Sequence, residues 1–179
     1  MSQERGKTMR PIQHVKNLTL IIICLSVTPV GAAQLPGVVE AHIAELESYC
    51  TDVGGHFQDP FQAILTADFN QDKRPDYVVD QLALSCDGAA SLYSGSGGAQ
   101  VNTFVSTPKG YINAWSGGAY GAEVEQGVLW LSVGGTYCGQ KHVASRADAI
   151  YCKRALTWNS AKRKMMIDPG IKPRPLTSN

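Results

Sequence analysis

The sequence predicts an α+β fold in which one N-terminal helix packs on an antiparallel β-meander, either a sheet or a partly closed barrel, with two disulfides. Three observations predict it: one stretch with helical periodicity, several later stretches rich in β-branched and aromatic residues, and four cysteines downstream of an export signal. Of the 179 residues, 44% are hydrophobic and 17% charged, which excludes a disordered, collagen-like or coiled-coil chain.

The first 33 residues, 1–33, have the pattern of an export signal. Basic residues from Arg5 to Lys16 precede an apolar run at 18–27, and small residues follow at 31–33. This order is typical of a signal peptide, and the apolar run is shorter than the roughly 20 residues of a membrane span. We therefore expect an exported protein, periplasmic or secreted, with no transmembrane segment in the mature chain.

Removal of this signal changes the net charge. The whole chain has 16 Lys and Arg against 15 Asp and Glu, a formal net charge of +1. Residues 1–33 contain four of the basic and one of the acidic residues, so 12 basic and 14 acidic residues remain and the mature net charge is −2. Nucleic acid is not expected as a partner, because phosphate binding requires clustered Lys and Arg.

Four cysteines remain after the signal: Cys50, Cys86, Cys138 and Cys152. An even number in an oxidising compartment predicts two disulfides, for which three pairings are possible. We favour Cys50–Cys86 and Cys138–Cys152, which join neighbours in the sequence, and each is expected to contribute about 2–4 kcal/mol. A zinc site is disfavoured because the chain has no C-x2-C pair.

Residues 36–53 form the one clear helix. Its apolar stripe recurs at steps of three and four and consists of Val39, His42, Ile43, Leu46, Tyr49, Cys50 and Val53. Pro36 suits the first turn, and Gly54 with Gly55 suits the C-terminal stop. Because His42 lies on the stripe, we expect it to be a packed histidine at the edge of the core rather than a catalytic one.

The rest of the domain is predicted to form strands. Six segments are rich in β-branched and aromatic residues: Tyr77–Leu84, Gln100–Thr107, Tyr111–Trp115, Val128–Val133, Ala149–Trp158 and Lys164–Ile167. Turn residues separate them and no long helical crossover is visible, which favours an antiparallel meander. We expect a single domain over residues 34–168, followed by a Pro-rich tail at 169–179 that is extended or frayed.

The most informative segment is the acidic loop, residues 67–80. Positions 1, 3, 5 and 9 of a D-x-[DN]-x-D-x-x-x-D pattern are Asp68, Asn70, Asp72 and Asp76. Calcium takes about six to eight oxygen ligands, and the carbonyl of Arg74 at position 7 would add one. The pattern predicts a structural calcium site with a Kd on the order of 10⁻⁴–10⁻³ M. The alternative is a polar turn in which these side chains cap their own backbone.

This loop resembles the calcium loops of FG-GAP (VCBS-type) β-propeller repeats and of dockerin modules, in which an aspartate-rich loop leads into an apolar strand. The resemblance covers about 14 residues and implies that the four Asp and Asn residues are ligands. More of the chain is similar to small exported bacterial proteins of unassigned function. Two positions depart from the calcium pattern: Lys73 replaces the usual Gly at position 6, where φ is positive, and Val79 replaces the Glu that EF-hands have at position 12.

A Gly-rich segment is the candidate contact loop, and it consists of Ser94, Gly95, Ser96, Gly97, Gly98 and Ala99. It lacks the Lys-Ser/Thr of a P-loop and the G-x-S-x-G order of a nucleophile elbow, so a hairpin connection is predicted. It also resembles the serine- and glycine-bearing loop with which periplasmic C-type lysozyme inhibitors enter the cleft of their target. That resemblance implies an inhibitor of a lysozyme-like enzyme as an alternative function.

The remaining candidates do not form a catalytic pattern. The histidines of the mature chain, His42, His56 and His142, have no metal-ligand spacing, and a small hydrolase is the least favoured class. The leading hypothesis is an exported, non-catalytic binding or envelope-associated module. Its partner would be a protein or glycan of the cell envelope, and two disulfides together with calcium would stabilise it.

Overall fold

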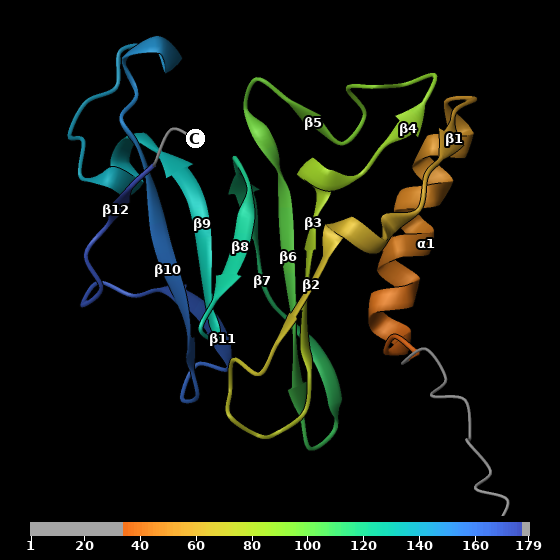
Figure 1. Cartoon of the computed structure of the whole chain (residues 1–179), viewed down its shortest axis with the longest axis horizontal. Coiled ribbons are helices and arrows are strands. Elements are labelled where there is room, and N and C mark those ends of the chain that lie inside the picture. The colour runs from red at the N-terminus through yellow and green to blue at the C-terminus, as the bar shows by residue number, and fades with distance from the viewer. Residues whose placement is uncertain (1–33, 177–179) are drawn as a thin grey trace, which may run out of the picture. The chain divides into compact units, whose positions relative to one another are not determined.

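The computed structural model describes residues 34–176, so the predicted signal lies outside the described residues (Figure 1). The helices and strands of this part are α1 (Gly37–Asp52), β1 (His56–Phe57), β2 (Ile64–Ala67), β3 (Asp76–Asp80), β4 (Cys86–Asp87), β5 (Ser94–Gly95), β6 (Gly98–Thr107), β7 (Gly110–Ala119), β8 (Ala122–Glu125), β9 (Val128–Gly134), β10 (Tyr151–Asn159), β11 (Lys164–Ile167) and β12 (Arg174–Pro175). Short 3-10 helices lie at Pro60–Ala63, Gln81–Ala83, Gly135–Cys138 and Arg146–Asp148. In residues 34–176 no helix combines the length and the apolarity that a membrane crossing requires.

Two five-stranded antiparallel sheets enclose the main core. The first has the order β2-β3-β6-β5, with β7 also paired to β6, and the second has the order β11-β10-β9-β8, with β12 paired to β10. The chain leaving β7 hydrogen-bonds to β9, since the amide of Tyr120 donates to the carbonyl of Ser132 and the amide of Ser132 donates to the carbonyl of Gly121. The two sheets therefore curl into a half-barrel.

Helix α1 covers the opposite face of the first sheet (Figure 1). Side chains alternate between the two faces along β3 and β6. Val78, Val101 and Val105 contact the second sheet, while Tyr77, Val79 and Phe104 pack in the cluster beneath α1. The predicted fold class, one helix on antiparallel β structure, is confirmed, and the layers are helix, first sheet and second sheet.

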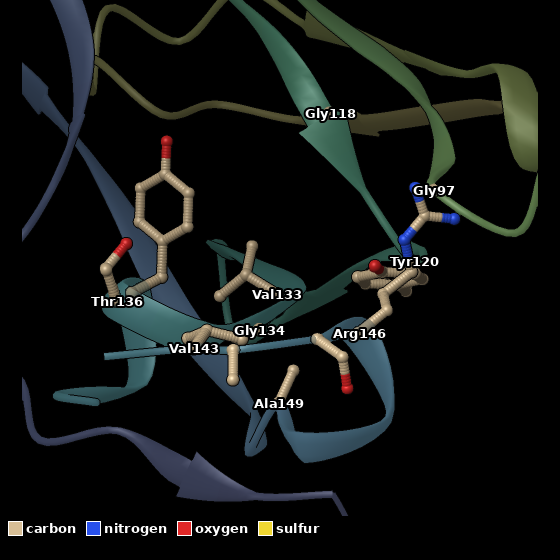
Figure 2. A pocket seen from close by; sticks show the side chains of 13 residues that line it. Gly97, Gly118, Tyr120, Val133, Gly134, Thr136, Val143, Arg146 and Ala149 are labelled. Carbon is tan, nitrogen blue, oxygen red and sulfur yellow. The ribbon is translucent and has the colours of Figure 1, made fainter. Parts of the chain in front are cut away.

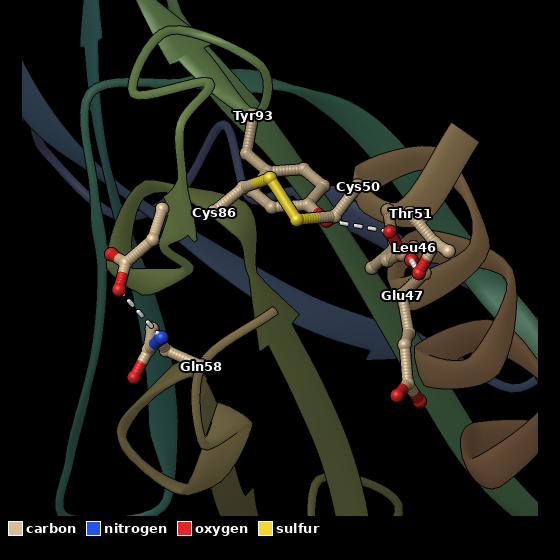
Figure 3. Close-up of a disulfide and its surroundings, with 8 residues drawn as sticks. Leu46, Glu47, Cys50, Thr51, Gln58, Cys86 and Tyr93 are labelled. Carbon is tan, nitrogen blue, oxygen red and sulfur yellow. Dashed lines mark hydrogen bonds between the residues drawn. A yellow bond between two sulfur atoms is a disulfide. The ribbon is translucent and has the colours of Figure 1, made fainter. Parts of the chain in front are cut away.

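Both predicted disulfides are present with the predicted pairing. Cys50–Cys86 ties the last turn of α1 to β4, and Cys138–Cys152 ties the 3-10 helix after β9 to β10. Figure 3 shows the first bond crossing from the helix, with the ring of Tyr93 beside it. A Cβ at Gly55 would collide with the sulfur of Cys86, so the helix stop also makes room for the disulfide.

The six predicted strands exist; Lys164–Ile167 has the predicted bounds and the other five differ from them. The predicted strand Tyr77–Leu84 ends at Asp80, because Asp80 Oδ1 accepts a hydrogen bond from the amide of Leu82 and starts a 3-10 turn. Strands β1, β2, β4, β5, β8 and β12 were not predicted, and each has four residues or fewer. The Pro-rich tail pairs with β10 through β12, and the Arg174 guanidinium lies 3.6 Å from the Trp130 ring centroid.

Candidate functional site

The acidic loop connects β2 to β3, and its side chains bind its own backbone. The two oxygens of Asp68 accept hydrogen bonds from the amides of Asp72 (3.1 Å) and Lys73 (2.8 Å). The amide of Asp72 also donates to Oδ1 of Asn70 at 3.1 Å. Lys73 has φ 66°, which is the left-handed conformation predicted for position 6 and costs a residue with a Cβ about 1–2 kcal/mol. The backbone thus follows the calcium-loop pattern although position 6 is not Gly.

Asp76 anchors this loop to the first sheet. Its side chain is fully buried, and its oxygens accept hydrogen bonds from the amides of Phe69 and Ser106, both at 2.7 Å. Burial raises the pKa of Asp76, and the two amide hydrogen bonds oppose that rise. Asp80 has a similar role at the other end of β3, where its Oδ2 accepts from the amide of Ala122 at 2.8 Å and so links the two sheets.

Asp72 is paired with a cation from its own loop. The Arg74 guanidinium donates to Asp72 Oδ2 from Nη2 at 2.8 Å and from Nε at 3.1 Å, and Ser106 Oγ donates to the same oxygen at 2.7 Å. The guanidinium beside it holds the pKa of Asp72 well below its usual range. Asn70 completes the contact with β6, since its side-chain amide donates to the carbonyl of Ser106 at 2.8 Å.

These hydrogen bonds determine how the predicted calcium ligands lie. In the part of the chain that the structure describes, no three His, Cys, Asp or Glu side chains are placed so that they could hold a metal ion together. Both oxygens of each of the three aspartates already accept hydrogen bonds, and Arg74 neutralises Asp72. The side chains thus make the hydrogen bonds of the alternative polar turn, which caps its own backbone. Calcium binding remains a prediction.

The Gly-rich segment forms the tight hairpin between β5 and β6. Ser94 pairs with Ala99 and Gly95 with Gly98, which leaves Ser96 and Gly97 at the exposed tip. Gly98 has φ 90°, and a Cβ there would collide with the carbonyl of Ala119, so only Gly fits. The hairpin is held from one side, because the Arg146 guanidinium donates a hydrogen bond to Ser96 Oγ.

Three adjoining hollows extend from this hairpin toward α1. The first has a volume of about 590 Å³, and Figure 2 shows Arg146 reaching across it toward Gly97, with Gly134 and Val143 on its walls. The second, about 420 Å³, lies along the hairpin itself, and the third, also about 420 Å³, lies between α1 and β6. The first two hollows share Gly97 and Gly118. The last two share Gln81, Leu92, Tyr93 and Gln100.

Two residues that line the third hollow each have a buried polar atom without a hydrogen-bond partner in the described chain. The His42 ring packs against Phe104 with 5.5 Å between ring centroids, and its Nδ1 lies 3.8 Å from a carboxylate oxygen of Glu45. Neither Nε2 of His42 nor Oδ1 of Asn102 has a hydrogen-bond partner among residues 34–176. A buried polar atom without a partner costs about 1–3 kcal/mol, so both atoms are expected to reduce the stability of the fold.

The sequence analysis covers part of this surface. It gives residues 94–98 as a candidate contact loop and does not name Gln81, Asn102 or Arg146, which line the adjoining hollows. A signal existed for Asn102, because it lies two residues before Phe104 and therefore on a strand face that packs beneath the helix. The three histidines lie in separate places: His42 faces the third hollow, His56 is exposed on β1, and His142 is exposed between β9 and β10.

Comparison with known proteins adds no family to these observations: the chain matches no protein-family model, no curated protein and no solved structure.

Proposed function

We propose that this chain is an exported, non-catalytic binding module of the cell envelope. Its contact surface is the hairpin Ser94–Gly98 together with the three hollows along it. The observation that carries this proposal is that the hollows adjoin and share lining residues, and that the first two border the exposed hairpin tip at Gly97. A partner can therefore contact the hairpin and both of its flanks at the same time.

The walls of this surface are held in place by covalent bonds, which supports a role in binding. Cys50–Cys86 fixes the end of α1, which forms a wall of the third hollow. Cys138–Cys152 fixes the segment after β9 to β10, next to residues that line the first hollow. A surface that is rigid before binding loses less conformational entropy when the partner arrives. Disulfides also persist in oxidising compartments, which supports export.

The surface suits a polar partner, a protein or a glycan of the envelope. The guanidinium of Arg146 lies at one end of the three hollows and the carboxylate of Glu45 at the other. Between them the lining consists largely of serine, glycine and glutamine, which offer hydrogen-bonding groups with little apolar area. If calcium binds the acidic loop, it acts at the opposite end of the first sheet and contributes to stability alone.

An inhibitor of a lysozyme-like enzyme is the second candidate, and the exposed tip of the hairpin favours it. Ser96 and Gly97 project from the first sheet at a two-residue connection, as an inserting loop must. The two candidates use the same hairpin and differ in the partner, so one set of variants tests both.

The test replaces residues 95–98 of the full, oxidised chain by a two-residue Asn-Gly turn. We expect retention on peptidoglycan sacculi and envelope membranes of the expressing bacterium to fall about tenfold or more, the effect of losing a central contact. The matched control replaces Pro108 and Lys109, the turn between β6 and β7, by the same Asn-Gly and should retain binding. Unchanged retention in the hairpin variant would refute the proposal. If the wild-type chain and the control variant inhibit a C-type lysozyme and the hairpin variant does not, the second candidate is favoured.

A further inference from the structure

A fourth hollow lies at the end of the half-barrel opposite the hairpin Ser94–Gly98. Its volume is about 350 Å³, and it is bordered by the acidic loop, the β6–β7 turn and the β10–β11 turn, which Figure 1 shows at the lower end of the strands. It is called the Trp158 hollow below, after the aromatic residue that lines it. Ligand pockets occupy about 300–1,000 Å³ and are common in the mouths of β-barrels, so its size and its place both suit a small molecule.

Trp158 gives this hollow an aromatic wall. The residue is half-buried near the end of β10, and it packs against the core between the two sheets. Pro108, in the β6–β7 turn, adds a second apolar surface. An aromatic ring of a ligand can stack on the indole or meet it edge to face. Because the core already holds the indole in place, this contact costs little additional conformational entropy.

Two cations line the Trp158 hollow without a carboxylate partner. The side chains of Lys109 and Arg163 are exposed, and neither forms an ion pair within residues 34–176. Asp72 also lines the hollow, but Arg74 neutralises it, and its oxygens accept hydrogen bonds from Arg74 and Ser106. The charges that remain available to a ligand are therefore positive.

Hydrogen bonds within the two turns support these cations. In the β6–β7 turn, Thr107 Oγ1 donates to the carbonyl of Gly110 at 2.7 Å. In the β10–β11 turn, the amide of Lys162 donates to Asn159 Oδ1 at 2.9 Å. Arg163 has φ 52°, a conformation that glycine adopts without strain and that a residue with a Cβ adopts at a cost. Side chains held in such conformations concentrate at functional sites.

We propose that the Trp158 hollow binds a small aromatic carboxylate. The carboxylate lies between Lys109 and Arg163, whose guanidinium matches the two oxygens of a carboxylate, and the ring of the ligand packs on Trp158. A cationic ligand would meet two unpaired positive charges, and a neutral ligand would leave both of them unpaired. The site goes beyond the proposed function, because it lies at the other end of the half-barrel and uses none of the hairpin residues.

The experiment is an NMR titration of the full, oxidised ¹⁵N-labelled chain with 1-naphthylacetate and with its neutral isostere 1-naphthylacetamide. EDTA is present, so that no divalent cation at the acidic loop can bridge to the carboxylate. We expect a saturable shift of the Trp158 indole N–H with the carboxylate, which Trp158→Phe assigns. The amide should bind about tenfold more weakly, and NaCl should weaken the carboxylate alone. Equal affinities for the two probes would overturn the proposal, as would the absence of a saturable shift at Trp158.

Substitutions of the two cations test the contacts. Lys109→Gln and Arg163→Gln should each weaken binding of 1-naphthylacetate about fivefold, and the double variant about tenfold or more. Arg163→Gly is a second variant at this position that keeps the turn, because glycine adopts φ 52° without strain, and it should weaken binding as much as Arg163→Gln.

Lys162→Gln is the matched control for these variants. It removes the same charge from the same turn at a residue that does not line the hollow, and it should change the affinity by about twofold or less. Wild-type affinity in the double variant would overturn the proposal. Equal losses in Lys162→Gln and Arg163→Gln would do so too, because the effect would then be one of net charge and not of contact.

Two replacements separate this inference from the proposed function. The variant with Pro108 and Lys109 replaced by Asn-Gly should keep its retention on the envelope and bind 1-naphthylacetate about fivefold more weakly or worse, whereas the replacement of residues 95–98 should do the reverse. If the first variant binds the carboxylate as the wild type does, the site is wrong and the binding module stands. If the second variant keeps its retention, the proposed function is wrong and the titration alone decides on the site.

Discussion

Two groups of polar side chains on the first sheet differ in their hydrogen bonding. In the acidic loop, the carboxylate oxygens of Asp68, Asp72 and Asp76 all accept hydrogen bonds from the protein. Beneath α1, Nε2 of His42 and Oδ1 of Asn102 have no hydrogen-bond partner in residues 34–176. Asn102 lies midway along β6, between the β2–β3 loop and the β5–β6 hairpin that Figure 1 shows on opposite sides of the strands.

This difference distinguishes carboxylates whose hydrogen bonds are complete from buried polar atoms that the fold leaves unpaired. The acidic loop is conspicuous in the sequence, yet its side chains are accounted for by the turn that they stabilise. Asn102 is inconspicuous in the sequence, and its unpaired oxygen destabilises the fold unless a ligand or water satisfies it. The following predictions test whether the carboxylates of the acidic loop are structural and what the unpaired oxygen of Asn102 costs the fold.

The largest expected effect comes from removing a disulfide. Replacing Cys50 and Cys86 by Ala should lower the free energy of unfolding by about 4 kcal/mol, and replacing Cys138 and Cys152 by about 3 kcal/mol, because the first bond closes the longer loop. Urea denaturation measures both. An equal loss of stability in both variants would contradict this dependence on loop length.

At the acidic end, Asp76→Ala should lower the free energy of unfolding by about 3 kcal/mol. The substitution leaves two buried amides, those of Phe69 and Ser106, without an acceptor. Asp59→Ala is the matched control, because Asp59 accepts a single hydrogen bond from the exposed amide of Phe61, and it should cost about 1 kcal/mol or less. Equal costs in urea denaturation would show that burial does not matter at this site.

The pH dependence of stability should have opposite signs for two carboxylates of this loop. Burial raises the pKa of Asp76, so its stabilising effect is complete below the ordinary value of about 3.9 and is lost as the pH rises through the folded-state pKa. The Arg74 guanidinium lowers the pKa of Asp72, so its effect is present above about 3.9 and is lost as the pH falls through the folded-state pKa. The loss of unfolding free energy in Asp76→Ala should therefore be larger at low pH, and the loss in Asp72→Ala should be larger at high pH. Urea denaturation of both variants and the wild type over a range of pH measures these losses.

The helix, the six predicted strands and the acidic turn could be predicted from the sequence because their signals are local. The stripe from Val39 to Cys50 lies within one helix, and Asp68 caps residues only four and five positions away. The disulfide pairing followed from sequence order, although three pairings were open. Short strands such as β1 and β4 carry no period of their own, since each has two residues and is held in place by its partner.

The third hollow could not be predicted because its lining comes from distant parts of the chain. His42 and Asn102 are sixty residues apart, and each lies within an otherwise apolar pattern that predicts burial. No local pattern shows that one oxygen and one nitrogen remain unpaired after folding. Arg146 is similar, since its hydrogen bond to Ser96 links segments fifty residues apart. Such pairings depend on the tertiary structure and not on sequence spacing.

Calcium titration gives a smaller effect and tests the acidic end directly. If the loop binds calcium as its resemblance implies, ten Kd of free calcium should stabilise the chain by about 1.4 kcal/mol, seen as a rise in melting temperature over the EDTA value. The rise should saturate, be absent with magnesium and vanish in Asp72→Ala. If the melting temperature does not rise, the hydrogen bonds of the turn alone account for its ordered conformation. Replacing residues 95–98 by Asn-Gly should leave the rise in melting temperature with calcium unchanged, because the hairpin lies at the other end of the sheet.

The smallest expected effect has the opposite sign and concerns Asn102, midway along β6. Asn102→Leu removes an unpaired buried oxygen and adds apolar volume beside Phe104, at the loss of one hydrogen bond to Ser116. We expect the free energy of unfolding to rise by up to about 1 kcal/mol, since replacing a half-satisfied buried amide by an apolar group is neutral to stabilising. Ser116→Ala, which removes the satisfied partner, should destabilise by about 1 kcal/mol. A clear loss of stability in Asn102→Leu would instead place Asn102 with Asp76, among the residues that serve the fold.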